Sequence, residues 1–378
     1  MFGKSKIKST DSVSEAILRK VKNKDVTEKT LNKIAEKIIS IKNATTPTTP
    51  TTKIQRQLSR GRNPRTLSVY TENMNDVCNA LQKIKNHAVY EKINKVIGAQ
   101  SVGYALSHTK NLLNNNIQSN QVSGKFDTLT LTLMCESESN NINKKIIDFS
   151  CLDSLFRYIK ESSDGNFKAI TKMARMNDIN EGHYTCIDVL KKGSKLDLVV
   201  YEPAYIQDFA NAGPNYGVKC LRQLLNEQFN KGKMKPEDTR TGIIEMGIQR
   251  SPDDCAIFSV SIAKNLFKYN NVSDLMFSKL HLRGQKFNRF YEASAIKIIK
   301  DTRNIKQKIY FPPLFLKHST SKSGFILTNA KDKIVNKKGQ NLQQRVEMNY
   351  KSRDGLAYSN SIELKRDIYL RRLNGQKK

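Results

Sequence analysis

Two β-rich runs joined by a short glycine-containing connection constrain the fold of this chain more than any other feature. The runs cover residues 183–190 and 195–202, with Lys-Lys-Gly-Ser between them, which is typical of an antiparallel hairpin. If the hairpin is centred on the peptide bond that precedes Gly193, His183 lies directly opposite Glu202 on the same face, with Cβ atoms roughly 5 Å apart. A carboxylate in that place holds an imidazole in one tautomer and stabilises its charged form.

A cysteine follows at a predicted junction between a strand and a helix. Residues 241–248 have the composition of a strand, and a helix start comes next, with Ser251 as the N-cap and Pro252 at the first helical position. Cys255 is then expected in the first turn of an apolar helix that continues over residues 256–267. Exposed amide groups and the positive end of the helix dipole favour a thiolate there, whereas the two preceding aspartates oppose it.

Each of these residues also has an ordinary structural interpretation. A free cysteine is most often a small buried apolar side chain, and the chain has five others: Cys78, Cys135, Cys151, Cys186 and Cys220. A histidine or a glutamate is common at a strand end, and Gln249 is typical of a solvated turn. The combination of the hairpin register with a cysteine at a helix start is what favours a cysteine-nucleophile site.

Several ordered motifs resemble those of a known family. The run IEMGIQRSPDDCAIFS, residues 244–259, resembles the nucleophile motif of the YopJ/AvrA effectors, which bacteria inject into host cells. His183 and the tripeptide that begins at Glu202, Glu-Pro-Ala, are similar to the family's histidine strand and to the end of its next strand. Residues 311–318 and 335–340 resemble two later segments, so that the resemblance covers roughly residues 145 to 350.

This resemblance implies an α+β fold with a ubiquitin-like-protease-type catalytic core, in which helices flank a mixed sheet. A helical regulatory subdomain is expected from segments on both sides of the core. The implied activity is transfer of an acetyl group from acetyl-CoA by a ping-pong route through acetyl-Cys255. By that interpretation Cys255 is the nucleophile, His183 is the base, Glu202 orients His183, and Gln249 stabilises the oxyanion. Ala256 stands where many members have glycine, which adds a methyl group near the oxyanion site.

Two other functions remain open at this point. The same three residues serve a cysteine protease that removes ubiquitin-like modifiers, because a thiolate attacks an isopeptide as naturally as a thioester. A CoA pocket and activation by a polyanion favour transfer, whereas a narrow tunnel for a diglycine tail favours hydrolysis. The third interpretation is a basic binding protein without enzymatic activity, for which the affinity for phosphate depends strongly on salt.

The composition indicates a polyanionic partner. Lys and Arg number 65 against 35 Asp and Glu, a formal net charge of +30, which calls for a polyanion, an acidic surface or considerable self-repulsion. The resemblance implies activation by inositol hexakisphosphate (IP6) in a basic pocket. The candidate IP6 ligands are Lys317, Lys322, Lys337, Lys338 and Arg345, and Lys317 is also the candidate for autoacetylation. A single lysine is usually a solvated side chain, so the cluster is what supports the pocket.

The resemblance further implies partners and a location. Ser, Thr or Lys side chains of host signalling proteins are the expected acceptors, with kinases the leading class, and an acidic secretion chaperone is a further candidate partner. The resemblance also implies type III secretion into the host cell cytoplasm. The absence of a hydrophobic signal peptide and of an apolar run of membrane-spanning length excludes ordinary secretion but not this route. The cysteine spacing predicts no metal and a reduced compartment, and the absence of a complete RNA-binding motif predicts no nucleic acid.

Five regions are predicted along the chain. They are a secretion region at 1–68, regulatory helices at 69–145, the catalytic core at 146–270, a regulatory or core-completing segment at 271–350, and a basic tail at 351–378 with a short helix from Ser361. The local predictions are helices at 25–42 and about 73–97, a Thr/Pro linker at 45–52, a strand at 127–135 from its alternating Thr and Leu, and helical structure over 151–180.

Overall fold

The computed structural model describes residues 87–176, 183–204, 214–251, 253–269, 297–299, 313–320, 332–353 and 356–376. The chain divides into two compact units, Met1–Ile97 and Gly98–Lys378. In the first unit the described residues are 87–97, where Tyr90, Ile93 and Ile97 are buried. The predicted helix at 25–42, the linker at 45–52 and residues 73–86 of the second helical region lie outside the described residues.

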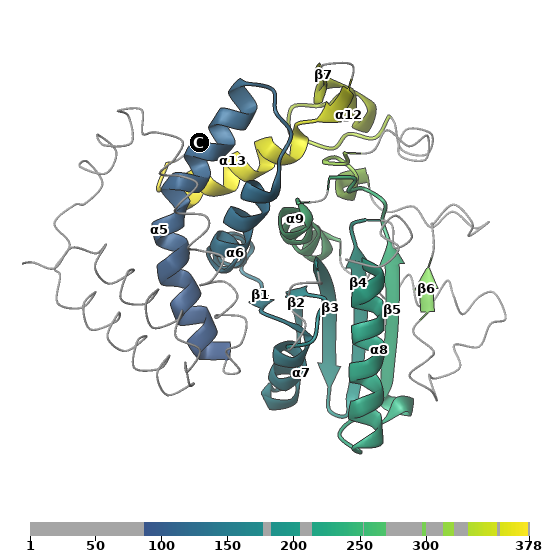
Figure 1. Ribbon diagram of the computed structural model, residues 1–378. Coiled ribbons are helices and arrows are strands. Elements are labelled where there is room, and N and C mark those ends of the chain that lie inside the picture. The colour runs from purple at the N-terminus through teal and green to yellow at the C-terminus, as the bar shows by residue number, and fades with distance from the viewer. Residues whose placement is uncertain are drawn as a thin grey trace, which may run out of the picture. The chain divides into compact units, whose positions relative to one another are not determined.

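The helices and strands follow one another along the chain as Figure 1 shows. The helices are α5 (His87–Asn114), α6 (Gln121–Ile142), α7 (Leu152–Glu161), α8 (Pro214–Asn230), α9 (Cys255–Lys268), α12 (Leu342–Met348) and α13 (Ser361–Leu373), with short 3-10 helices η3 (Pro236–Asp238) and η5 (Pro313–Phe315). The strands are β1 (Ile146–Phe149), β2 (Gly165–Lys172), β3 (Tyr184–Lys192), β4 (Lys195–Glu202), β5 (Thr239–Glu245), β6 (Lys297–Ile299), β7 (Tyr350–Arg353) and β8 (Leu356–Ser359).

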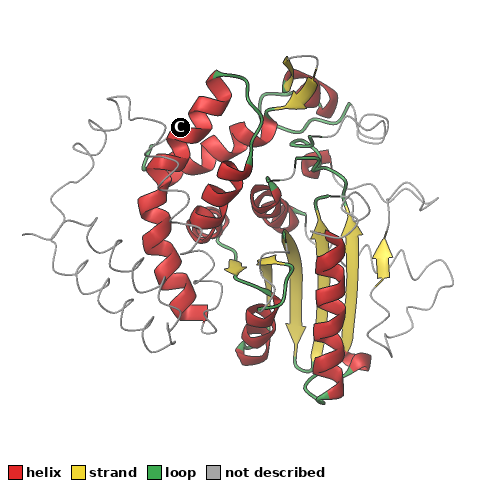
Figure 2. Cartoon of the chain, viewed as in Figure 1, coloured by secondary structure: helices red, strands yellow, loops and turns green. Residues whose placement is uncertain are grey.

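A mixed sheet forms the centre of the second unit. Its strands lie in the order β1-β2-β3-β4-β5-β6 (Figure 2), and β7 with β8 makes a separate hairpin. β2, β3 and β4 are antiparallel neighbours, whereas β1 pairs parallel with β2, and β5 pairs parallel with β4 and β6. Parallel neighbours need a crossover connection, and α7 and α8 supply it between β1 and β2 and between β4 and β5.

The two faces of the sheet are covered by different helices. Apolar side chains of α7 and α8 pack with alternate strand residues such as Val189 and Val200 in one buried cluster. Phe167 and Ala169 of β2 also belong to that cluster, so Lys168 between them points to the opposite face, because side chains alternate along a strand. There the Lys168 ammonium lies 4.6 Å from the centre of the Phe267 ring, which places α9 on that face.

The predicted strand at 127–135 is wrong, because these residues lie within α6. Thr128 and Thr130 donate their hydroxyls to the carbonyl oxygens of Gly124 and Phe126, at 3.0 and 2.7 Å, so their polar groups are satisfied inside the helix. α6 is also buried on several sides, and both Leu129 and Leu131 are 1% exposed. A helix buried all round loses the one-sided apolar pattern that marks a helix in a sequence.

The prediction of helical structure over 151–180 is right for α7 and wrong for β2. Residues 167–171 of β2 are all buried, because the strand lies between helices on both faces. Such a strand has no polar face and therefore no alternation by which it could be recognised.

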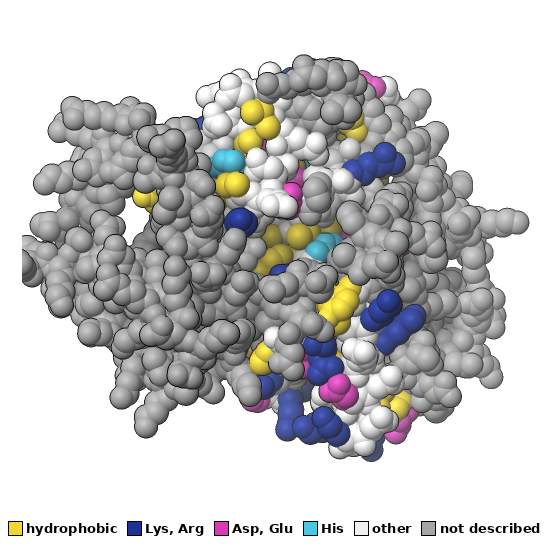
Figure 3. Space-filling view, viewed as in Figure 1, with side chains coloured by type: hydrophobic (Ala, Val, Ile, Leu, Met, Phe, Trp, Pro, Cys, Tyr) yellow, Lys and Arg dark blue, Asp and Glu magenta, His cyan; other side chains and the backbone are white. Residues whose placement is uncertain are grey.

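The described surface is basic in places. Figure 3 shows Lys and Arg side chains gathered at the end of the core where β3 turns into β4 and α8 ends, and Lys192, Lys195, Lys231 and Lys233 are exposed there. Within the described ranges, no helix combines the length and apolar character needed to cross a membrane. In the same ranges, no group of His, Cys, Asp and Glu side chains is arranged to hold a metal ion.

Candidate functional site

The predicted hairpin is present, but its register differs by two residues from the prediction. Its turn consists of Gly193, at φ +59°, and the serine that follows, so that Lys192 pairs with Lys195. His183 is therefore not directly opposite Glu202. A shift of two residues leaves both side chains on the same face, and diagonal neighbours remain within reach of long side chains.

His183 and Glu202 form a direct hydrogen bond despite the corrected register. The His183 Nε2 lies 2.6 Å from the Glu202 Oε2, and the two side chains are 13% and 4% exposed. The other carboxylate oxygen, Oε1, accepts a hydrogen bond of 2.9 Å from the Ala204 N–H. Both oxygens of Glu202 are thus engaged, which fixes the imidazole and leaves its Nδ1 for another partner.

Cys255 is held against the first residue of β3. Its Sγ accepts a hydrogen bond of 3.4 Å from the Tyr184 N–H, and one turn later the Ser259 hydroxyl donates to the Tyr184 carbonyl at 3.2 Å. Cys255 is partly exposed, whereas the other cysteines in the described part of the chain, Cys135, Cys151, Cys186 and Cys220, are buried. Cys78 lies outside that part. The accessible thiol therefore lies beside the start of the histidine strand.

The environment of His183 stabilises its protonated form. Burial by itself lowers the pKa of the imidazole, but the Glu202 charge, a side-chain hydrogen bond with Cys255 and the bond to Glu202 together raise that pKa from 6.5 to about 10. His183 thus contacts both the carboxylate and the thiol, and it carries a proton at neutral pH. The structure brings the three predicted site residues together.

The predicted start of the nucleophile helix is wrong by three residues. α9 begins at Cys255 with Asp254 as the N-cap, and the Asp254 side chain makes no capping hydrogen bond. Its carboxylate instead accepts hydrogen bonds from the Arg366 guanidinium and from the hydroxyls of Ser119 and Ser251. Ser251, the predicted cap, is thereby used to hold Asp254 rather than the helix.

Gln249 lies in a segment that pairs with the end of β4. Its N–H donates to the Pro203 carbonyl at 2.9 Å, its Nε2 donates to the Ser251 carbonyl at 2.6 Å, and the side chain is buried. The Gln249 Oε1 is buried without a hydrogen-bond partner in the described part of the chain. One side-chain N–H remains for a ligand, so the oxyanion role of Gln249 stays a prediction.

Two of the five predicted IP6 ligands lie around one buried histidine. His318 bonds through Nδ1 to the Ser361 hydroxyl at 2.9 Å, and its Nε2 has no partner among the described residues. Burial and the positive charges of Lys365, Lys317 and Arg345 hold the pKa of His318 well below its usual value. Of the other candidates, Lys337 and Lys338 are exposed, and Lys322 lies outside the described residues.

Lys365, on α13, also lies among these cations, and the sequence analysis did not predict it as a ligand. Burial and the charge of Lys264 lower the pKa of Lys365, and the charges of Lys317 and Arg372 lower it further. Glu138 opposes this shift, but the pKa still lies well below its usual value. We call Lys264, Lys317, Arg345, Lys365 and Arg372, with Glu138, the cation cluster. No sequence signal singles out Lys365, because its neighbours come from segments distant along the chain.

The family match covers most of the second unit. Residues 102–372 match the family described as YopJ Serine/Threonine acetyltransferase. The chain belongs to this family. Its membership confirms the resemblance that the nucleophile and histidine motifs indicated.

Two curated YopJ-family relatives are described as the serine/threonine-protein acetyltransferase YopJ, one from Yersinia pestis and one from Yersinia pseudotuberculosis. Each is 27% identical over 193 residues, which cover 49% of this chain and 59% of the relative. The alignment thus spans less than two thirds of these relatives' own length.

Solved structures of YopJ-family effectors share the fold. A deletion variant of AvrA with IP6 and CoA has a TM-score of 0.52 and 18% identity, covering 73% of this chain and 98% of that one. HopZ1a in complex with IP6 has a TM-score of 0.52 and 16% identity, covering 74% of this chain and 96% of that one. The predicted α+β class, a ubiquitin-like-protease-type core with a mixed sheet and flanking helices, is confirmed.

Proposed function

We propose that this protein is an effector acetyltransferase that takes an acetyl group from acetyl-CoA onto Cys255 and passes it to serine, threonine or lysine side chains of host signalling proteins, with kinases the leading class. The observation that carries the proposal is the contact of His183 with both Glu202 and the accessible Cys255. Family membership supports acetyl transfer, and the CoA in the AvrA structure supports this donor.

His183 performs the proton transfers in this scheme. His183 accepts the proton of the Cys255 thiol, and its pKa of about 10 stabilises the imidazolium that forms. Cys255 then attacks the thioester carbonyl, and His183 returns the proton to the departing CoA sulfur. In the second half, His183 removes the proton of the acceptor hydroxyl or amine, which attacks the acetyl group on Cys255 and releases the thiolate.

Glu202 and Gln249 support these steps from fixed positions. Glu202 is the charge that stabilises the imidazolium and keeps Nδ1 directed at the thiol, because its bond to Nε2 occupies the other nitrogen. We assign the oxyanion to the free N–H of the Gln249 side chain and to the backbone N–H at the start of α9. Ala256 is 2% exposed, so its methyl group is already accommodated by the surrounding packing.

The cation cluster fits IP6 as an activator. Lys264 and Arg372 pair with the buried carboxylate of Glu138, and burial together with neighbouring cations lowers the pKa values of Lys365 and His318. The unpartnered His318 Nε2 supplies a polar atom beside them. Lys317, Arg345 and Lys365 are the residues that we expect to hold the phosphates, because charge-assisted hydrogen bonds to phosphate oxygens are strong, and Lys317 remains the proposed site of autoacetylation. The IP6 in the AvrA and HopZ1a structures supports IP6 as the ligand.

Delivery into the host cell cytoplasm by type III secretion belongs to the same proposal, and the family membership supports it. An acidic secretion chaperone would suit a chain with a formal net charge of +30, because an acidic surface relieves the self-repulsion of that charge. Binding of the purified chain to an acidic chaperone that weakens with salt tests this part.

The test is the intact mass of the purified full-length chain after mixing with acetyl-CoA, with and without IP6. We expect acetyl adducts on the Cys255 peptide and, through autoacetylation, on the Lys317 peptide; both should be absent in Cys255→Ala and should form faster with IP6. Glu202→Gln, which keeps the shape but removes the charge, should slow adduct formation by at least about 100-fold. A wild-type protein that stays unmodified while a ubiquitin-like probe labels Cys255 would replace the transferase with the protease.

A further inference from the structure

A second group of buried charges lies at the start of the nucleophile helix. The Arg366 guanidinium, on α13, donates through Nε and Nη2 to both oxygens of Asp127, each at 2.7 Å, and through Nη2 to the Asp254 Oδ1 at 2.5 Å. All three side chains are at most 1% exposed. A forked guanidinium of this kind fixes two carboxylates in direction as well as in distance.

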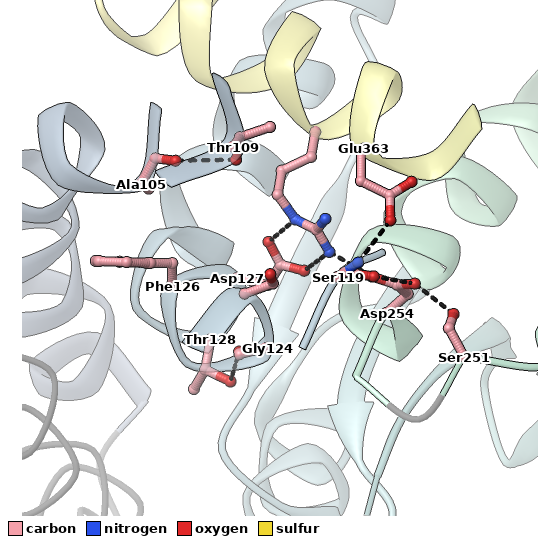
Figure 4. A network of polar contacts seen from close by, with 12 residues as sticks. Ala105, Thr109, Ser119, Gly124, Phe126, Asp127, Thr128, Ser251, Asp254 and Glu363 are labelled. Atoms are coloured by element: carbon pink, nitrogen blue, oxygen red, sulfur yellow. Dashed lines mark hydrogen bonds and ion pairs between the residues drawn. The ribbon is translucent and has the colours of Figure 1, made fainter. Parts of the chain in front are cut away.

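Two loops complete the same group, which we call the carboxylate cluster. Ser119 donates its hydroxyl to the Asp254 Oδ2 at 2.7 Å and its N–H to the Glu363 Oε1 at 2.8 Å, and the Ser251 hydroxyl also reaches Asp254 (Figure 4). The Asp254 carboxylate is therefore held from α13, from the α5–α6 loop and from the segment after β5. The residue that follows it is Cys255.

The packing around this group leaves little freedom. A Cβ added at Gly124, in the first turn of α6, would lie 3.1 Å from the Asp253 carbonyl oxygen and 3.2 Å from the Asp253 Cβ. α6 thus approaches the segment before Cys255 as closely as a glycine permits. The first turn of α9 is fixed by side chains and by backbone packing together.

Carboxyl groups outnumber the cation in this cluster. Asp127 from α6, Asp253 and Asp254 before α9, and Glu363 from α13 face the single guanidinium, and His108 from α5 also feels the Arg366 charge. The Glu363 Oε2 and the Arg366 Nη1 are buried without hydrogen-bond partners among the described residues. Arg366 therefore bonds two of these carboxylates directly and attracts the others, and its loss would leave them without that charge.

We propose that Arg366 is a positioning residue for Cys255: through Asp254 it fixes the first turn of α9 so that the thiol meets His183. The C-terminal helix is then part of the catalytic apparatus although it contributes no group to the reaction. The inference rests on Cys255 being the nucleophile of the proposed function. Arg366 and Asp254 act as one unit, since neither can hold the helix start without the other.

The experiment compares how fast iodoacetamide alkylates Cys255 in the wild type, Arg366→Met, Asp254→Asn and the double variant. The extent of alkylation is read from the mass of the Cys255 peptide at several pH values between about 5 and about 10. Each single variant should react about tenfold more slowly at neutral pH, with the profile displaced towards higher pH. The double variant should be no slower than either single variant. Asp254→Asn is decisive, because the loss of a negative charge beside the thiol would by itself speed the reaction.

Matched variants exclude general loosening of the helix. Arg371→Met, on the same helix, removes a side chain that is 48% exposed and paired with Asp367, and it should leave the rate within about twofold. If Arg366→Met does not fold, Ser119→Ala removes one hydrogen bond to Asp254 and should slow alkylation about threefold. The proposal fails if Asp254→Asn reacts as fast as the wild type, if Ser119→Ala is unchanged, or if Arg371→Met is equally slow.

Alkylation does not require acetyl-CoA, so the two proposals can fail separately. A wild type that acquires no acetyl group, together with the expected alkylation pattern, overturns the transferase and leaves the positioning role in place. A wild type that is acetylated, with variants that alkylate normally, overturns the positioning role alone.

Discussion

The carboxylate cluster and the cation cluster both involve α13, and they resolve an excess of charge in opposite ways. At the carboxylate cluster, burial raises the pKa of Asp127 to about 6 and that of Glu363 to about 7, with Arg366 opposing both shifts. The excess carboxylates can therefore take up protons from solvent. At the cation cluster, burial lowers the pKa values of Lys365, His318 and Arg345, but an arginine guanidinium is not deprotonated in proteins.

This difference indicates what each cluster needs from outside. The carboxylate cluster is closed, because protons and one guanidinium neutralise it and its members bond to one another. In the cation cluster the buried carboxylate of Glu138 bonds Lys264 and Arg372. An anionic ligand would add negative charge beside these cations. The first cluster is thus suited to holding structure, and the second to binding a ligand.

The largest expected effect is a difference in the free energy of unfolding between a variant of the carboxylate cluster and a variant of the cation cluster. Arg366→Met should lower the free energy of unfolding by about 3–5 kcal/mol, because it leaves buried carboxylates without their cation. Arg345→Met, which removes a half-buried cation from among like charges, should change it by less than about 1 kcal/mol. Urea unfolding without IP6 measures both, and equal losses would show that the cation cluster is neutralised inside the protein.

The next effect is a dependence of stability on pH. The folded pKa values of Asp127 and Glu363 lie above their ordinary values of 3.8 and 4.5. The folded protein therefore binds more protons, and stability that is present at about pH 4 is lost as the pH rises through about 6 and 7. Glu363→Gln should reduce this loss by on the order of 1–3 kcal/mol, measured by urea unfolding at several pH values. Glu237→Gln, exposed in η3, should leave the profile unchanged.

A smaller effect tests the ligand at the cation cluster. IP6 at about 100 times its Kd should stabilise the wild type by about 2.7 kcal/mol, seen as a rise in Tm. Lys365→Met should lose about 1–2 kcal/mol of that gain, whereas the exposed Lys337→Met should retain it. A variant of Lys337 that loses as much as the variant of Lys365 would move the site towards the 335–340 turn.

The smallest effect compares a serine of the carboxylate cluster with the serine that bonds His318 beside the cation cluster. Ser251 bonds the carboxylate of Asp254, and Ser361 bonds the neutral ring of His318. Hydrogen bonds to charged groups contribute more, so Ser251→Ala should cost about 1 kcal/mol more than Ser361→Ala in urea unfolding. An equal cost would contradict this ranking of the two hydrogen bonds.

Local patterns predicted the elements around the site better than their exact geometry. The hairpin strands, the strand before Cys255 and the apolar helix after it are all present. The turn was misplaced by one position, which shifted the register by two residues, because Lys-Lys-Gly-Ser permits more than one two-residue turn. The start of α9 was misplaced because Asp254 and Ser251 are occupied by Arg366 and by each other, contacts that no local pattern encodes.

The sequence by itself determined the family and the α+β class through its ordered motifs. It also indicated His183, Glu202 and Cys255 as the candidate site, because side-chain alternation and a helix start are local properties of the chain. The tertiary structure alone decided that α13 joins both charge clusters. Arg366 meets Asp127 across 239 positions of the chain and Asp254 across 112, and Lys365 meets Lys317 from a separate segment. Long-range pairing of charges depends on how packed helices bring distant residues together, and burial then sets the energy of each pair.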